Sequence, residues 1–108
     1  MDENTEPHQL PVGVRLRLGR VVATPGALAA LQRAGQSASD FLSRHQRGDW
    51  GDLCADDSKL NDEAVAHEHD EEFRTRVLSA YRTKLDERLW VITEADRSST
   101  CLLLPEDY

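Results

Sequence analysis

The most apolar part of the chain is its C-terminal end, where two runs of aliphatic, β-branched and aromatic residues flank the polar segment 94–99. This pattern predicts a β-hairpin whose loop is the polar segment. Alternating residues just upstream predict one further strand. Together they predict an antiparallel meander that carries the core, with strands at 75–83, 88–95 and 99–104.

Three helices are predicted ahead of this meander. Segment 24–35 begins with Thr-Pro, a favoured N-cap and first helical residue, and ends at a glycine. Segment 37–48 begins with a serine that is followed three residues later by an aspartate, as in a capping box, and also ends at a glycine. The third helix begins at Asp56 and Asp57, whose charge suits a helix N-terminus, and ends near 67–70.

The N-terminal region divides into two parts. Residues 1–12 are acidic and polar and are predicted to be a disordered tail. The apolar alternation of residues 14–22 predicts a strand that has a bulge or an end at Gly19 and adds to the edge of the sheet. Residues 13–108 are therefore expected to form a single α+β domain, with a three- to four-stranded antiparallel sheet packed against two to three short helices.

Composition narrows the function classes. The chain has 108 residues, of which 39% are hydrophobic and 31% charged, and its net charge is −7. That charge argues against direct nucleic-acid binding and against binding to anionic lipid. The sequence shows neither an apolar run of the ~20 residues that a membrane helix needs nor a signal peptide, so we expect a cytoplasmic protein.

The charges fall into blocks of one sign. Residues 13–48 carry six arginines against one aspartate, whereas residues 49–72 carry ten acidic residues against one lysine. Such blocks steer association with an oppositely charged partner, and the acidic block could imitate a phosphate backbone for a nucleic-acid-binding protein. The alternative is that the acidic helix folds over the basic helices of its own chain or is simply solvated.

The hairpin loop is the best candidate for a second contact surface. Glu94 and Asp96 could supply a carboxylate base and Arg97 an anion clamp, but no catalytic motif accompanies them. The alternative is a turn in which Asp96 and the serines bond to local backbone and Arg97 pairs with a neighbouring acid. His67 to Asp70 lack ligand spacing, so no metal or cofactor is predicted.

Four separated segments resemble a family of small bacterial proteins carried by plasmids and other mobile elements: GRVVATPGAL (19–28), GDWGDL (48–53), WVITEADRS (90–98) and LLPEDY (103–108). Members are described as plasmid-related or hypothetical proteins, and sometimes as a type I restriction enzyme subunit. The resemblance spans residues 18–108. It implies a mobile-element setting and no particular activity.

Three function hypotheses follow. The first is a non-enzymatic protein that binds a host or rival protein, such as a nuclease or DNA-binding protein of a defence system, and inhibits it. The second is a toxin-like small RNase that uses the arginine-rich block, or the regulator of such an RNase. The third is a structural homodimer formed through an open sheet edge. For the first, the expected partner-binding residues are Asp49, Trp50, Asp52, Asp56, Asp57, Asp62, Glu63, Glu94, Asp96 and Arg97. Trp50 has a rival role as a core anchor of its turn.

Overall fold

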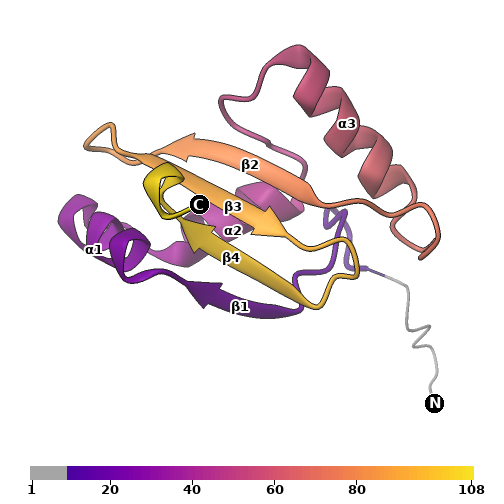
Figure 1. Cartoon of the computed structure of the whole chain (residues 1–108), viewed down its shortest axis with the longest axis horizontal. Helices are drawn as coiled ribbons and strands as arrows, with labels where there is room; N and C mark the ends of the chain where they lie inside the picture. Colours follow the sequence, from indigo (N-terminus) through magenta and orange to yellow (C-terminus); the bar gives the residue numbers. More distant parts are fainter. Residues whose placement is uncertain (1–9) are drawn as a thin grey trace.

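The computed structural model describes residues 10–108, so most of the predicted tail lies outside the described residues. The helices are α1 (Pro25–Ala34), α2 (Ala38–Gln46), α3 (Ala55–Ala66) and the short 3-10 helix η1 (Pro105–Asp107). The strands are β1 (Arg20–Ala23), β2 (Val77–Arg82), β3 (Arg88–Thr93) and β4 (Ser99–Leu103). The α+β class is confirmed, with α1 and α2 behind a four-stranded sheet and α3 beside β2 (Figure 1).

The sheet has the strand order β1-β4-β3-β2. Strands β2, β3 and β4 form the predicted antiparallel meander, in which Val91 lies opposite Ser79 on one side and Leu102 on the other. β1 pairs with β4 in parallel, so the sheet is mixed rather than wholly antiparallel. The apolar pattern of β1 indicated a strand, but a pattern of this kind carries no information on the direction of its neighbour.

The strand predicted for residues 14–22 is correct only at its end, because β1 begins at Arg20. The preceding residues bond to the end of α2 instead of to a strand. The backbone N–H of Arg15 donates to the carbonyl of Gln46 at 2.7 Å, and the side-chain amide of Gln46 donates to the carbonyl of Leu16 at 3.3 Å. Leu16 is fully buried, so its apolar character reflects packing without strand pairing.

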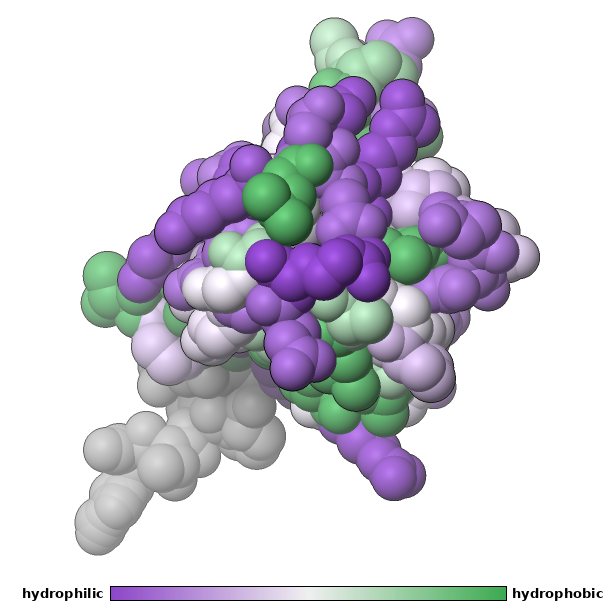
Figure 2. Space-filling view, turned by 90° about the vertical axis from the view of Figure 1, so that its left-hand side faces the viewer, coloured by the Kyte–Doolittle hydropathy of each residue, from purple (hydrophilic) through white to green (hydrophobic). Residues whose placement is uncertain are grey.

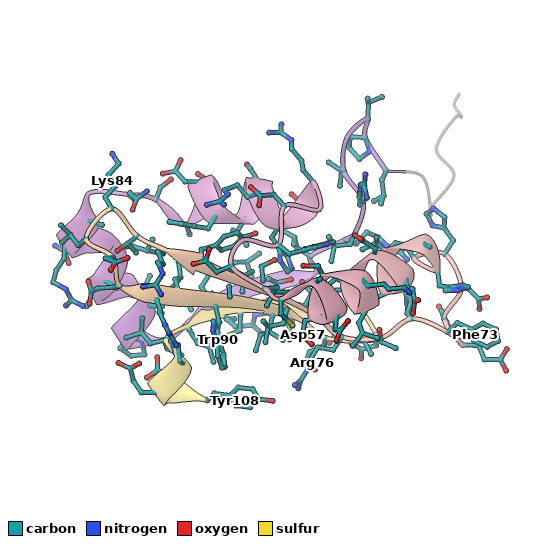
Figure 3. The ribbon with its side chains drawn as sticks, turned by 90° about the horizontal axis from the view of Figure 1, so that it is seen from above. Asp57, Phe73, Arg76, Lys84, Trp90 and Tyr108 are labelled. Carbon is teal, nitrogen blue, oxygen red and sulfur yellow. The ribbon has the colours of Figure 1, made fainter. Side chains whose placement is uncertain are left out.

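The main core lies between the sheet and the two helices behind it. The caps of α1 are the predicted ones: the hydroxyl of Thr24 accepts from the N–H of Ala27 at 3.1 Å, and Gly35 ends the helix in the left-handed conformation. α2 ends at Gln46 with Arg47 as its C-cap, two residues before the predicted end. Seen from above, α2 lies on one side of the sheet, and Trp90 and Tyr108 lie on the other (Figure 3). The buried core residues are Ala27, Leu31, Phe41, Tyr81, Leu89, Val91 and Leu102.

A second, smaller cluster forms around Trp50, as the anchor interpretation predicted. Trp50 is only 5% exposed and packs with Leu16, Ala64 and Val77. Its indole N–H donates to Asp62 of α3 at 3.0 Å. The turn is thereby fixed between the N-terminal segment, α3 and the start of β2.

The outer edge of β2 is closed by polar groups. The side-chain amide of Asn61 in α3 donates to the carbonyl of Leu78 at 2.8 Å and accepts from its N–H at 3.4 Å. Further along, Ala80 donates to the carbonyl of Trp50 and accepts from the N–H of Asp52. β1 is the strand at the other edge of the sheet, and no strand within residues 10–108 pairs with its outer side.

Gly51 and Gly35 provide a matched test of this edge closure. Both have positive φ values, 76° and 65°, but a Cβ on Gly51 would collide with the carbonyl oxygen of Ala80, whereas nothing lies within 4 Å of a Cβ on Gly35. We expect Gly35→Ala to cost about 1 kcal/mol, from left-handed strain alone. Gly51→Ala should cost about 3 kcal/mol, because it also separates the turn from β2. Urea unfolding measures both, and equal losses would contradict the edge closure.

Candidate functional site

Ion pairs within the chain occupy part of the acidic block. Asp49 accepts from Nε of Arg44 at 2.7 Å, and this hydrogen bond holds the pKa of Asp49 below its ordinary value. Asp52 accepts from Nε of Arg82 at 3.1 Å. These two predicted contact residues already have cationic partners in their own chain, at exposed positions where such pairs are weak.

The tip of the β3–β4 hairpin is a locally bonded turn. The N–H of Arg97 donates to the carbonyl of Glu94 at 2.9 Å, and the N–H of Ser98 donates to the carboxylate of Asp96 at 2.9 Å. Hydrogen bonds from Ser98 lower the pKa of Asp96. Glu94 lies 3.6 Å from Arg76. This arrangement fits the turn alternative for Asp96, whose carboxylate bonds to the backbone of its own turn.

The side chain of Arg97 turns inward and is buried against Glu68. Its Nε donates to Glu68 Oε1 at 2.8 Å, while Nη1 donates to the carbonyls of Thr75 and Glu94 at 2.8 and 2.9 Å. Glu68 is 2% exposed, and its second oxygen accepts from the backbone N–H of Arg17 at 2.8 Å. The pairing of Arg97 with an acid was one of the sequence alternatives, and the acid is Glu68, two residues beyond the end of α3.

A chain of hydrogen bonds between side chains crosses the core on the inner face of the sheet. His45 of α2 contacts Ser79 through Nδ1 at 2.6 Å and Thr93 through Nε2 at 2.9 Å. Thr93 contacts Thr100 at 2.7 Å, and Thr100 donates to the carbonyl of Leu18 at 2.7 Å. These four side chains are fully buried.

The carbonyl of Leu18, at the end of this series of hydrogen bonds, determines which group donates in each bond. Because Thr100 donates to a carbonyl, it must accept from Thr93, and Thr93 must in turn accept from Nε2–H of His45. Burial and the nearby charge of Arg97 lower the pKa of His45 to about 4, so the neutral ring leaves Nδ1 free to accept from Ser79. The Ser79–His45 contact is therefore structural, since no substrate can reach it.

Two of the acidic residues left exposed on α3 lie one helical turn on either side of an exposed apolar side chain. Asp56, Leu60 and Glu63 are spaced i, i+4 and i+7, so they share one side of the helix. Leu60 is 61% exposed. It lines two shallow hollows of about 240 and 250 Å³, one shared with Phe73 and the other with Asp57. Figure 3 shows Asp57 and Phe73 near opposite ends of α3. We call this surface, made by Asp56, Asp57, Leu60, Glu63 and Phe73, the α3 face.

The ten predicted contact residues thus separate into groups. Asp56, Asp57 and Glu63 lie together on the α3 face, and Asp62 is drawn away toward Trp50. The other six lie in the turn before α3 or on the hairpin. Sequence reasoning missed Leu60 and Phe73 as surface residues, because an apolar residue in a helix or before a strand is ordinarily assigned to the core.

Comparisons with models of protein families, with curated proteins and with solved structures find no match. Within residues 10–108, no three His, Cys, Asp or Glu side chains are placed to hold a metal ion. The described part of the chain also has no helix with the length and apolarity required to cross a bilayer.

The buried histidine predicts a pH dependence of stability. In the unfolded chain His45 takes up a proton near pH 6.5, whereas in the folded protein it does so only near pH 4. The unfolded state therefore binds more protons between these values, so the free energy of unfolding should fall by about 3 kcal/mol as the pH drops through this window.

Chemical unfolding across this pH range tests the assignment. His45→Gln should be less stable at neutral pH and should lose this part of the slope, because the substituted side chain cannot titrate. The exposed His67 provides the control, since His67→Gln should retain the slope. A slope that survives in His45→Gln would show that other groups produce it.

Proposed function

We propose that the protein is a non-enzymatic binding protein that contacts a cationic partner protein through the α3 face. The observation that carries the proposal is the exposed Leu60 set between two hollows and flanked by Asp56 and Glu63. Exposed apolar side chains with a polar rim are typical of protein contact sites. Charge complementarity selects a partner segment that presents an apolar side chain between lysines or arginines.

The mobile-element setting suggested by the family resemblance gives this chemistry a natural target. A nuclease or DNA-binding protein of a host or rival defence system holds nucleic acid in a cationic groove. An acidic helix with an apolar centre can occupy such a groove and exclude the nucleic acid. The proposed activity is therefore inhibition by direct contact.

The two other hypotheses gain different support. The RNase hypothesis needs a free basic face, yet Arg17, Arg33 and Arg44 all lie beside acids of their own chain.

The homodimer hypothesis is favoured by the open edge of β1, where Val21 and Val22 are partly exposed. Sedimentation at two protein concentrations distinguishes a dimer from the proposed monomeric inhibitor.

Leu60 and Leu85 form a matched pair for the test, because they are 61% and 57% exposed. Leu85 lies in the β2–β3 loop, at the end of the molecule viewed in Figure 2, where hydrophobic side chains appear only in small groups among hydrophilic ones. We expect Leu60→Ser to weaken partner binding by about tenfold or more, as for a central contact residue. Leu85→Ser should bind as the unchanged protein does.

The measurement is affinity capture from host lysate at low salt, followed by titration with the purified captured protein. Asp56→Asn combined with Glu63→Gln should reduce the association rate and its salt dependence, because both acids belong to the rim. Binding through the α3 face would be refuted if no protein were captured. It would also be refuted if Leu60→Ser and Leu85→Ser changed the affinity for the captured protein equally.

A further inference from the structure

A further hollow lies at the hairpin tip, and it shares no lining residue with either of the hollows beside Leu60. Its volume is about 420 Å³, and three arginines line it. Arg17 comes from the segment before β1, Arg74 from the segment between α3 and β2, and Arg97 from the hairpin loop. Gly19, Glu71 and Asp96 complete the lining. We call this hollow the arginine cleft.

Each of the three guanidinium groups has one buried nitrogen without a hydrogen-bond partner: Nε of Arg17, Nε of Arg74 and Nη2 of Arg97. A buried donor left unpaired is costly and rare in folded proteins. All three arginines line the same hollow, and Nε of Arg17 lies 3.8 Å from Glu68 Oε2, beyond hydrogen-bond distance. An acceptor bound in the cleft would supply the missing hydrogen bonds.

The arginines are held in place by other bonds. The side chain of Arg97 is 3% exposed and is fixed by Glu68 and by the carbonyls of Thr75 and Glu94. The carbonyl of Glu68 accepts from Nη1 of Arg74 at 3.4 Å and from Nη2 of Arg17 at 3.5 Å. The unpaired nitrogens therefore belong to a preformed arrangement, which lowers the entropy loss on binding a ligand.

We infer that the arginine cleft binds the carboxylate group of a small molecule. The two oxygens of a carboxylate offer about four acceptor positions, which is enough for all three donors. Guanidinium groups also match the planar geometry of a carboxylate. The charges around the cleft also favour a carboxylate over a phosphate. The three arginines are balanced by three acids, Glu68 below and Glu71 and Asp96 in the lining, so the cleft has little attraction for a multiply charged phosphate.

Acetate is the probe, and the arginine Nε–H signals in nitrogen-15 NMR spectra are the readout. The signals of Arg17 and Arg74 should shift with acetate and saturate in the millimolar range, because their unpaired donors gain an acceptor. The signals of Arg33 and Arg82 serve as internal controls, since their Nε groups already donate to Glu87 and Asp52. Sodium chloride at the same ionic strength should produce no saturating shift.

Arg74→Gln should weaken acetate binding, measured at the Arg17 signal, by about tenfold. Arg76→Gln is the matched control, because Arg76 is two residues away and bonds to Tyr108 outside the cleft. Backbone amide spectra verify that both variants remain folded. Three results would overturn the assignment. They are shifts that stay linear with acetate concentration, shifts equal to those of Arg33 and Arg82, and tighter binding of inorganic phosphate than of acetate. These outcomes do not depend on the proposed function, since the Leu60 variants leave the cleft unchanged.

Discussion

The buried ion pair between Glu68 and Arg97 is the interaction that positions the segment before β1, the end of α3 and the hairpin tip relative to one another. It joins the end of α3 to the hairpin tip, and the second oxygen of Glu68 holds the backbone of Arg17 just before β1. A buried charge is tolerated only when it is paired and hydrogen-bonded, so neither residue can leave this site without a large loss. These segments pack weakly by apolar contact, so the buried charged groups hold them in place.

The same pair connects the core to the surface. The positive charge of Arg97 adds to burial in keeping His45 neutral, and the neutral ring sets the direction of the hydrogen bonds through Thr93 and Thr100. Arg97 also lines the arginine cleft, and its Nη2 is buried without a hydrogen-bond partner. The α3 face is separate from this network, and its acids remain available for a partner because they lie on the outer side of the helix.

Local patterns were sufficient for much of the fold. The helix caps at Thr24 and Gly35 and the meander were predictable, because each depends on residues close together in the sequence. The parallel pairing of β1 and the burial of Glu68 were not predictable, because both depend on partners far along the chain. For the candidate site, the acidic helix was evident from composition, whereas its apolar centre at Leu60 became evident only once the helix was placed against the sheet.

The most direct test of this account compares the free energies of unfolding of two glutamate-to-glutamine variants at neutral pH. Glu68 and Glu87 both bond to an arginine, at 2.8 and 2.6 Å, but only the Glu68 pair is buried. Glu68→Gln should cost about 3 kcal/mol or more, because it leaves the Arg97 charge buried and unpaired, whereas Glu87→Gln should have little effect at its partly exposed position. Similar effects of the two substitutions would contradict the central role of the Glu68–Arg97 pair.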